Sequence, residues 1–262
     1  MKIFIFKLVR MFHLLIADRG LPKRVALYCH SIEKKDYDAL RDATIYFVNN
    51  GYAFCDMERY IAVDGNPKIA LTLDDNYYSW YQALDVLEEL EIKATFFTNT
   101  LPLRDRASAE EINSYYKRIK HNGEKKPLSV RELRAIDARG HVIGSHTRSH
   151  FMLTELSMEH AKEEIRGGKE DLENILGKAI THFSYPFGMR RHFSRELMSY
   201  CLEIGITTIC SAIHGMMHTI PKDSFVVHRT IWHFEKPGSY NLANLRVDGR
   251  IFESLTGRNA VI

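Results

Sequence analysis

Residues 68–76 have the sequence KIALTLDDN, an apolar run that ends in two adjacent carboxylates, Asp74 and Asp75. A short apolar run between polar residues is typical of a buried strand, so this stretch predicts a strand with both aspartates just past its carboxyl end. Two like charges repel each other there, and they are tolerated where one binds a cation and the other is held for proton transfer. The alternative is that Asp-Asp-Asn opens a turn or caps the next helix.

The composition fits one large α/β domain as well as two small ones. The chain has 262 residues, of which 45% are hydrophobic and 26% are charged, so it can bury a full core. A formal net charge of +3, with no basic run or zinc-finger spacing, argues against nucleic acid as a partner. Four cysteines occur without a Cys-x-x-Cys pair, and we expect them to be buried thiols in a reducing compartment. They are Cys29, Cys55, Cys201 and Cys210.

Residues 1–17 are strongly apolar but are interrupted by Lys2, Lys7, Arg10 and His13. The uncharged stretches are too short to span a bilayer, and no small-residue cleavage site follows, so a transmembrane helix and a secretory signal both fit poorly. Two interpretations stay open. The segment is either a basic amphipathic helix on an anionic membrane surface or a helix packed on the protein's own core.

Apolar runs and helix-period segments alternate along the rest of the chain. Strands are predicted at 24–31, 68–76, 93–98, 141–146, 181–185, 206–212 and 224–231, and helices at 37–50, 79–91, 129–138, 157–176 and 194–204. Strands joined through helices predict parallel strands with helices outside, in a barrel or an open sheet. Residues 104–127 are polar and of mixed charge, which indicates an exposed insertion with some helix that shapes substrate access.

Three polar groups fall at the carboxyl ends of predicted strands, where barrels and open α/β sheets build their active sites. They are Asp74-Asp75, His146, and Tyr-Pro-Phe-Gly at residues 185–188. His146 and His150 are four residues apart, so both rings can bind one metal ion if the backbone between them forms a helical turn. A carboxylate from another strand would complete a three-ligand site with positions open for water and substrate.

These residues resemble, in order and in rough separation, the first three motifs of polysaccharide deacetylases, carbohydrate esterase family 4 with its NodB-homology domain. The matching stretches are Thr-Leu-Asp-Asp-Asn at 72–76, His-Thr-x-x-His at 146–150 and Ser-Tyr-Pro-Phe-Gly at 184–188. Tyr28-x-His30 and residues 94–97 and 140–146 are also similar to that family. The resemblance implies an α/β fold, a distorted barrel of seven or eight β/α units.

The resemblance covers residues 24–232 and so implies a division of the chain. Residues 1–23 form an apolar, basic N-terminal segment, residues 24–232 form the catalytic domain with its insertion at about 104–127, and residues 233–262 form a C-terminal extension.

The resemblance also implies a divalent metal ion, with zinc expected first and cobalt, nickel or manganese as alternatives. Its ligands would be Asp75, His146 and His150. Asp74 would be the general base that takes a proton from water. Backbone N–H groups near residues 185–187 (Tyr185, Pro186 and Phe187) would face the oxyanion, and a separate acid would protonate the departing amine.

Two departures from the family pattern matter. The first motif ends in Asn76 where the family usually has glycine, and the third has Ser184 where the family usually has the arginine that orients the base. We expect Arg229, at the end of a later strand, to reach Asp74 across the barrel in place of that arginine.

The acid is predicted less directly than the base. His228 is the expected acid, in place of the family's late histidine, with His214, His218 and His233 as competitors. His30 ends the first predicted strand, and we expect it to support a ligand or the loop packing rather than to bind the metal.

The predicted function is that of a metal-dependent hydrolase that removes an N-acetyl or other N-acyl group from an amino sugar. The substrate would be a surface polysaccharide or a lipid-linked glycan precursor, and the protein would be cytoplasmic or peripheral on the inner membrane face through residues 1–17. Two alternatives stay open: a deformylase or other amidase on a nucleotide- or lipid-linked sugar, and an inactive sugar-binding family member. Asn76 and Ser184 motivate the inactive alternative.

Overall fold

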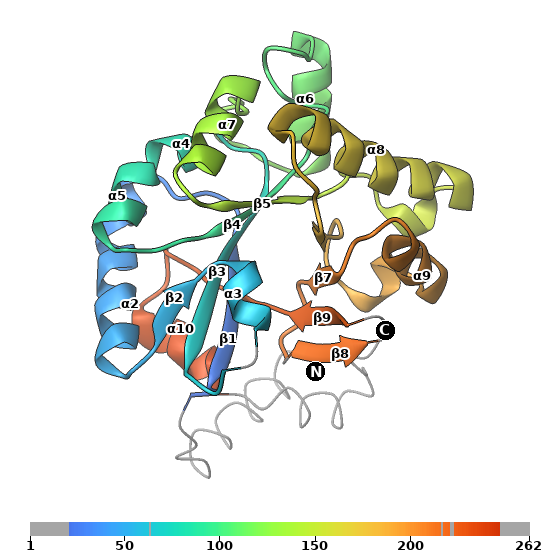
Figure 1. The fold of residues 1–262 in the computed structure, drawn as a ribbon. Coiled ribbons are helices and arrows are strands. Elements are labelled where there is room, and N and C mark those ends of the chain that lie inside the picture. Colours follow the sequence, from blue (N-terminus) through green and yellow to red (C-terminus); the bar gives the residue numbers. More distant parts are fainter. Residues whose placement is uncertain (1–20, 63, 216, 221–222, 247–262) are drawn as a thin grey trace, which may run out of the picture.

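The computed structural model describes residues 21–62, 64–215, 217–220 and 223–246. The expectations for residues 1–17 therefore lie outside the described residues, as does the last part of the C-terminal extension. Figure 1 shows the described chain as a curled sheet with helices around its outside.

The sheet contains ten strands within the described residues, in the order β10-β1-β3-β4-β5-β6-β7-β9-β8, with β2 paired to the start of β3. The pairing of β8 with β9 is antiparallel and the other pairings are parallel. The strands are β1 (Arg24–Cys29), β2 (Ala53–Cys55), β3 (Lys68–Asp75), β4 (Thr95–Thr98), β5 (Val142–Ser145), β6 (His182–Ser184), β7 (Thr208–Ser211), β8 (Met217–Ile220), β9 (Ser224–His228) and β10 (Thr230–Ile231).

The last part of the sheet joins its two ends. Strand β9 pairs with β7, while β10 pairs with β1, and only Arg229 separates β9 from β10. The chain therefore crosses at Arg229 from one end of the strand order to the other. This curled sheet with outer helices confirms the predicted distorted barrel of β/α units.

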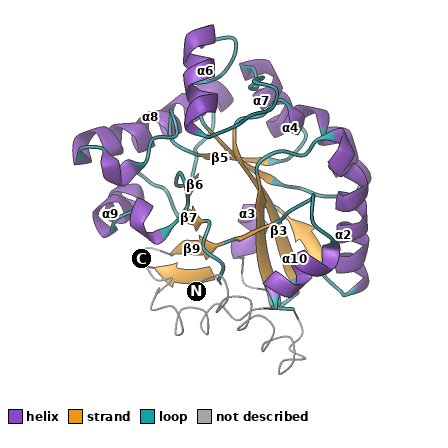
Figure 2. Cartoon of the chain, turned by 180° about the vertical axis from the view of Figure 1, so that it is seen from behind, coloured by secondary structure: helices purple, strands orange, loops and turns teal. Residues whose placement is uncertain are grey.

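Helices cover the outer face of the sheet in both views (Figures 1 and 2). They are α2 (Tyr37–Asn49), α4 (Ser79–Gln82), α5 (Leu84–Glu89), α6 (Ala109–Arg118), α7 (Val130–Ala138), α8 (Met158–Leu176), α9 (Arg195–Glu203) and α10 (Gly238–Leu245), with short 3-10 turns at Lys34–Asp36, Leu153–Glu155 and Arg190–His192. Helix α3 (Met57–Ile61) instead packs against side chains of the barrel interior. Two of the predicted caps form: the Ser129 hydroxyl accepts from the Glu132 N–H, and that of Ser157 accepts from the His160 N–H.

Three details differ from the sequence prediction. The helix expected at 79–91 is two short helices. The break lies at Ala83, where ψ is −4° instead of the value of about −42° that a regular α-helix has. Strand β2 was missed because it has three residues, of which only Cys55 is buried. Strand β8 was missed because it is a half-exposed antiparallel edge without a buried face.

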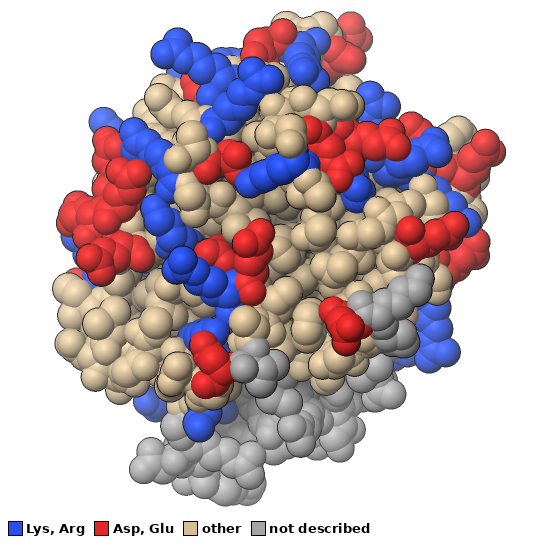
Figure 3. Space-filling view, in the orientation of Figure 1, with Lys and Arg blue, Asp and Glu red and all other residues tan. Residues whose placement is uncertain are grey.

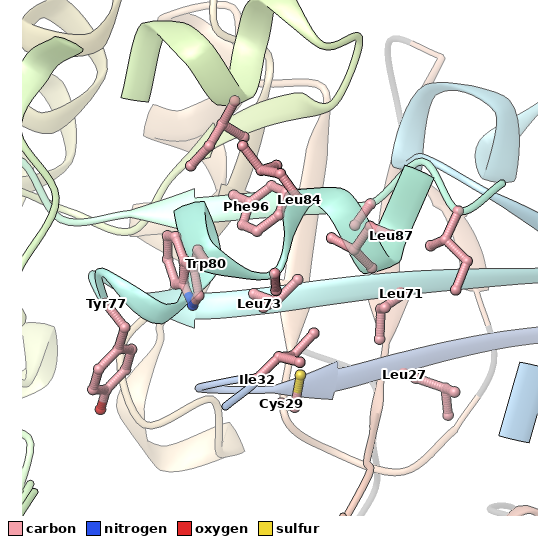
Figure 4. Packing of buried hydrophobic residues seen from close by; sticks show 14 of the residues in the cluster. Leu27, Cys29, Ile32, Leu71, Leu73, Tyr77, Trp80, Leu84, Leu87 and Phe96 are labelled. Carbon is pink, nitrogen blue, oxygen red and sulfur yellow. The ribbon is translucent and has the colours of Figure 1, made fainter. Parts of the chain in front are cut away.

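Alternation along β3 divides its side chains between two environments. Leu71 and Leu73 pack outward against the helices, in the cluster that includes Trp80, Leu84 and Phe96 (Figure 4). Ala70 instead faces the barrel interior, in a cluster with Met57 and Tyr60 of α3, and with Phe97, Cys210 and Val227 of other strands. By the same alternation, Thr72 and Asp74 point into the barrel.

All four cysteines are free and buried, which confirms that part of the prediction. Burial raises the pKa of the Cys55 and Cys210 thiols to about 12. These thiols therefore stay protonated at neutral pH and are poor nucleophiles.

Two histidines are buried in their neutral form at the amino-terminal side of the sheet. His182 opens β6, and within the described chain neither of its ring nitrogens has a hydrogen-bond partner. His141 precedes β5, and its Nδ1 accepts a hydrogen bond from the Ala94 N–H at 3.1 Å. Burial lowers the pKa of each to about 4.

We predict that these histidines make the protein sensitive to acid. Their folded pKa lies below the ordinary value, so the unfolded chain binds more protons and stability falls as the pH drops from about 6.5 to about 4. Urea unfolding at several pH values should show His182→Leu losing part of this slope, worth up to about 3 kcal/mol. The exposed-site control His160→Gln should keep the slope, and an unchanged slope in His182→Leu would contradict the prediction.

Candidate active site

Asp74 and Arg229 form a buried, two-pronged ion pair inside the barrel. Arg229 Nη1 donates to Asp74 Oδ1 and Arg229 Nη2 donates to Asp74 Oδ2, each at 2.7 Å. The guanidinium is fully buried and the carboxylate nearly so. The contact expected from the sequence, an arginine at a late strand end that reaches Asp74, is therefore confirmed.

The other donors of Arg229 are also used. They bind the Thr72 hydroxyl at 2.9 Å, the Ser184 hydroxyl at 2.7 Å and the Ser211 carbonyl at 2.9 Å. Together with the two bonds to Asp74, these account for all five N–H groups of a guanidinium. The group also lies over the rings of Tyr28 and Phe97, with its central carbon 5.1 and 5.2 Å from their centroids. A buried charge with every donor satisfied is tolerated where an unpaired one is not.

Ser184 explains how an arginine from a different strand can reach Asp74. Its small side chain leaves room for the guanidinium, and its hydroxyl donates to Asp74 Oδ2 at 3.2 Å. Burial alone would raise the pKa of Asp74, but the Arg229 guanidinium and His146 together hold that pKa below its ordinary value. Asp74 is therefore ionised at neutral pH.

Asp75, His146 and His150 bring three possible metal ligands together. One ligand atom from each lies within 4.8 Å of the others, and all three residues are buried. Asp75 Oδ1 is 3.6 Å from His146 Nε2 and 3.2 Å from His150 Nε2, so both rings present the same nitrogen to one carboxylate oxygen. One carboxylate and two imidazoles are a donor set that suits zinc and related divalent ions.

A second contact fixes the tautomer that a metal ligand needs. His146 Nδ1 lies 2.6 Å from the Ser184 carbonyl oxygen, an acceptor, so Nδ1 carries the proton and Nε2 keeps its lone pair. Burial would raise the pKa of Asp75, but the neighbouring His150 and His146 rings hold that pKa well below its ordinary value. The side chains present thus fit a divalent cation.

The loop that carries the two histidines is not the helical turn expected from their spacing. Residues 146–150 have no regular structure, and Thr147 and His150 have positive φ angles of 67° and 62°. The Thr147 hydroxyl accepts the His150 N–H at 3.1 Å and stabilises the turn. A tight non-helical loop therefore brings the two rings to 4.9 Å between centroids.

Helix α8 holds this loop from outside. The Glu164 carboxylate accepts hydrogen bonds from the Ser149 N–H at 2.9 Å and from its hydroxyl, and the Glu164 carbonyl accepts the Arg148 N–H at 3.1 Å. The loop backbone lies so close to the helix that a Cβ added at Gly168 would meet the Thr147 carbonyl carbon at 2.6 Å. Because Gly168 has no side chain, the loop backbone can lie close to α8, and the hydrogen bonds of Glu164 hold it there.

Four site residues adopt backbone angles that favour glycine. Besides Thr147 and His150, Asp75 has φ of 86° and Phe187 has φ of 62°. Non-glycine residues in this region are strained and persist where surrounding contacts fix them, often at functional sites.

The insertion at 104–127 is tied to the site more closely than its polar sequence indicates. Tyr115 and Tyr116 of α6 are fully buried. The Tyr115 hydroxyl donates to Asn99 Oδ1 at 2.9 Å, and the Tyr116 hydroxyl donates to the Asn76 carbonyl at 3.1 Å. The expectation of an exposed insertion is therefore wrong for this face of α6. Ile112, Tyr115, Tyr116 and Ile119 pack on the core at helical spacing, and the mixed charge of the segment conceals this pattern.

Asn76 and Asn99 connect the insertion to the ligands. The Asn76 amide donates to the Asn99 carbonyl at 2.9 Å and accepts from the Leu128 N–H at 2.7 Å. The Asn99 amide in turn donates to the His146 carbonyl, and its backbone N–H donates to the Asp75 carbonyl at 3.0 Å. The side chain of Asn76, which stands where the family usually has glycine, thus links the end of the insertion to the residue that holds the His146 carbonyl.

A pocket of about 270 Å³ contains the two aspartates and both ligand histidines. Its other lining residues are Tyr28, His30, Arg118, Ile119, Lys120, Phe187, Gly188 and Ala212. Three of them come from α6 and the turn after it, so the insertion forms part of the pocket wall, as the sequence predicted.

Only some of the residues predicted to contact the substrate or to act as the acid line the pocket. Phe187 lines the pocket, whereas Tyr185 is fully buried in the core beneath α8 and α9. His228 is buried, with its Nδ1 2.7 Å from the Ser211 hydroxyl, and does not line the pocket. His30, which the sequence indicated only as a supporting residue, does line it, and its charge lowers the pKa of both aspartates.

Of the three backbone positions expected near the oxyanion, only one is suited to donate. Pro186 has no N–H, and the Tyr185 N–H donates to the Cys210 carbonyl at 3.4 Å. The Phe187 N–H makes no hydrogen bond within the described part of the chain, and Phe187 lines the pocket.

Comparison with known proteins agrees with this site. The family model described as polysaccharide deacetylase matches residues 62–209, more than half of the chain, and includes Asp74, Asp75, His146 and His150. The chain belongs to the polysaccharide deacetylase family. The match also spans residues 184–188, whereas Arg229 lies beyond its end.

Two curated relatives of this family member illustrate the range of similarity. A chitin deacetylase of Colletotrichum lindemuthianum is 30% identical over 120 residues, which cover 45% of this chain and 41% of the relative. A peptidoglycan-N-acetylglucosamine deacetylase of Bacillus cereus is 28% identical over 138 residues, covering 50% of this chain and 42% of the relative. The matched region thus spans less than half the length of either relative.

Solved structures share the fold of this polysaccharide deacetylase chain. The Streptococcus pyogenes deacetylase PplD, in complex with acetate, has a TM-score of 0.68 at 16% identity, covering 86% of this chain and 99% of that one. A polysaccharide deacetylase from Bacillus cereus has a TM-score of 0.63 at 20% identity, covering 84% and 68%.

The helices of the described residues can be compared with the length and hydropathy that a membrane span needs. No helix there is both long enough and apolar enough to cross a bilayer. Basic and acidic side chains are mixed over the helices on the face shown in Figure 3.

We predict that removing one partner of the buried pair is costly. Arg229→Met should lower the free energy of unfolding by about 3–5 kcal/mol, because Asp74 would be left as an uncompensated buried charge. In a double-mutant cycle with Asp74→Asn, the two changes together should cost less than their sum, by at least about 1 kcal/mol. Denaturant unfolding measures all four proteins.

An exposed pair provides the control for this cycle. Arg139 contacts Asp85 at 2.8 Å on the surface, and Arg139→Met should cost about 1 kcal/mol or less. Equal costs for Arg139→Met and Arg229→Met would contradict the importance assigned to the buried pair.

Proposed function

We propose that this chain is a metal-dependent hydrolase that removes an N-acyl group, acetyl above all, from an amino sugar. The observation that carries the proposal is that one pocket contains both a set of possible metal ligands and, beside it, a carboxylate that is kept ionised. Asp75, His146 and His150 offer a metal-ligand set, and beside them Arg229 keeps the second carboxylate, Asp74, ionised. Family membership supports the reaction class, and the names of the relatives support an N-acetylated sugar as substrate.

The metal ligands and the base would have separate tasks. A divalent ion on Asp75, His146 and His150 would supply Lewis acidity toward a water molecule and an amide carbonyl. Asp74 would accept the proton of the attacking water at its carboxylate. Because both Asp74 oxygens bind Arg229, that carboxylate keeps a fixed position and charge as the reaction begins.

Two further residues would complete the reaction. The Phe187 N–H would donate a hydrogen bond to the oxygen that becomes negative as the carbonyl is attacked. His30 would give a proton to the departing amine nitrogen, since it lines the same pocket as the ligands. We prefer His30 to His228 for this role because an acid must reach the leaving group.

An inactive sugar-binding protein is the poorer interpretation of the same residues. Asn76 and Ser184, the two departures that motivated it, each make hydrogen bonds that support the site. Deformylation or another amide hydrolysis would use the same groups. A cytoplasmic location and membrane contact through residues 1–17 stay predictions.

Metal binding and activity should separate at the two neighbouring aspartates. We expect the wild-type chain to bind one divalent ion, and Asp75→Asn to lower its affinity because a charged ligand is lost. Asp74→Asn should keep the ion but lose roughly 10²–10⁴-fold in turnover, because the base is removed. Metal content after dialysis and acetate release from N-acetylglucosamine oligomers, with zinc or cobalt loaded, measure both effects.

The outcomes of this experiment are distinct. Unchanged metal binding in Asp75→Asn would refute the ligand assignment. A metal-loaded wild type that releases no acyl group from any N-acyl amino sugar would refute the proposed reaction.

The two candidate acids can be distinguished directly. His30→Gln should reduce turnover by roughly 10²-fold or more while zinc stays bound, since the leaving amine would lose its proton donor. His228→Gln should have a smaller effect on turnover at equal metal content. The reverse order would restore the assignment made from the sequence.

A further inference from the structure

Two cationic side chains from the insertion line the active-site pocket. Arg118 ends α6 and Lys120 follows in the next turn, and both face the cavity that contains Asp74, Asp75 and the ligand histidines. Arg118 donates a hydrogen bond to the Ser149 carbonyl, and its guanidinium carbon lies 3.8 Å from the centroid of the Phe151 ring. Neither cation forms an ion pair with an acidic residue in the described part of the chain.

The acids of the pocket do not balance these charges. Asp74 is already neutralised by Arg229, through two bonds at 2.7 Å. Asp75 contacts His146 and His150 and would be more than balanced by a divalent ion. A ligand that enters the pocket therefore meets the positive charges of Arg118 and Lys120. The negative charge of Glu164 acts on Arg118 from outside the pocket, but neither cation has an acidic residue of the pocket as its partner.

The positive surface continues beyond the pocket. An adjoining hollow on the outside of α6 shares Lys120 with it, and Lys117 and Lys125 also line this hollow. Its remaining lining residues are Asn113, Ser114, His121, Asn122 and a single acidic residue, Glu110. Lys120 thus stands where the two concave surfaces meet.

The backbone at Lys120 supports a role for this side chain. Lys120 has φ of 55° and directly follows Ile119, the residue that caps the C-terminal end of α6. This left-handed position after a helix usually carries glycine, which adopts it without steric cost. A lysine at this position accepts that cost and places an ammonium group at the edge of the pocket.

We propose that the substrate carries a phosphoryl group next to its N-acylated sugar, and that Arg118 and Lys120 bind that group. A phosphate offers several anionic oxygens, which suit a guanidinium fork and an ammonium side by side. Two cations without an ion-pair partner among the described residues match the two charges of a phosphate monoester or a diphosphate better than one carboxylate. This inference rests on the proposed function for the sugar itself, but it concerns binding and is tested by binding.

The test compares two ligands that differ only in the phosphate. N-acetylglucosamine and N-acetylglucosamine 1-phosphate are titrated by calorimetry into the zinc-loaded full chain. We expect the phosphate to bind roughly 10-fold to 100-fold more tightly. That ratio should fall with added potassium chloride, because exposed charges are screened.

Variants assign the preference to the two cations rather than to the metal. Lys120→Gln should reduce the ratio by about 3-fold to 5-fold, and the Arg118→Gln/Lys120→Gln double variant should bring it close to one. Arg131→Gln, which removes an exposed cation on α7, is the matched control and should leave the ratio unchanged. A double variant that keeps the wild-type ratio at the same zinc content would overturn the proposal.

Further ligands identify the source of the phosphate. A nucleotide-diphosphate sugar and a polyprenyl-diphosphate sugar in detergent are titrated in parallel, and tighter binding of either one supports the proposal and names its source. A hyaluronan tetrasaccharide, which carries carboxylates, should bind more weakly than the sugar phosphate, and the opposite order would overturn the choice of phosphate.

Acyl release by the same proteins separates this inference from the proposed function. If no ligand loses its acyl group but the phosphate preference depends on Arg118 and Lys120, the proposed reaction fails and this binding site stands. If neutral and phosphorylated sugars are hydrolysed and bound equally well, the reaction stands and this inference fails.

Discussion

The buried ion pair of Asp74 and Arg229 is the interaction on which the rest of the site depends. Its cation lies between β9 and β10, where the chain passes from one end of the curled sheet to the other. From there its five donors reach β3, β6 and β7. One side chain thus links the closing segment of the barrel to the strands that carry the base and the Tyr-Pro-Phe-Gly turn. Desolvating such a pair is costly, and the complete set of hydrogen bonds offsets that cost.

The pair also explains how two adjacent carboxylates can do different work. Asp74 points into the barrel and is held by a permanent cation, so it stays ionised with its oxygens fixed. Asp75 ends the same strand, at a strained backbone angle, and faces two histidine nitrogens from a loop that α8 and Asn99 hold in place. The environments differ because successive residues of a strand point to opposite sides. The two neighbouring carboxylates therefore have different hydrogen-bond and ion-pair partners: Asp74 binds Arg229, and Asp75 contacts His146 and His150.

Local patterns in the sequence predicted the elements and the ligand set, but not the contacts between distant segments. Apolar runs between helix-period segments predicted parallel strands with helices outside, and the family resemblance favoured a barrel over an open sheet. Asp75, His146 and His150 were proposed as ligands from strand-end placement and family resemblance. Arg229 could be predicted because Ser184 stands where the family usually has an arginine, so another cation was needed near Asp74. The roles of Asn76, Asn99 and the buried tyrosines of α6 could not be predicted, since they depend on residues 16 to 52 positions apart that meet only in the fold. His228, the acid predicted from the sequence, does not line the pocket, whereas His30 does, and the identity of the acid stays a proposal.

Anomalous diffraction from crystals of the zinc-loaded protein can test whether Asp75, His146 and His150 bind the metal while Asp74 stays paired with Arg229. The method locates the metal and identifies its ligands in one measurement. We expect one zinc peak at about 2.0–2.2 Å from a carboxylate oxygen of Asp75 and from the Nε2 atoms of His146 and His150. Asp74 should remain bound to Arg229, outside the coordination sphere. A zinc ion coordinated by Asp74, or a well-occupied zinc peak elsewhere with none at these three ligands, would contradict the separate tasks assigned to Asp74 and Asp75.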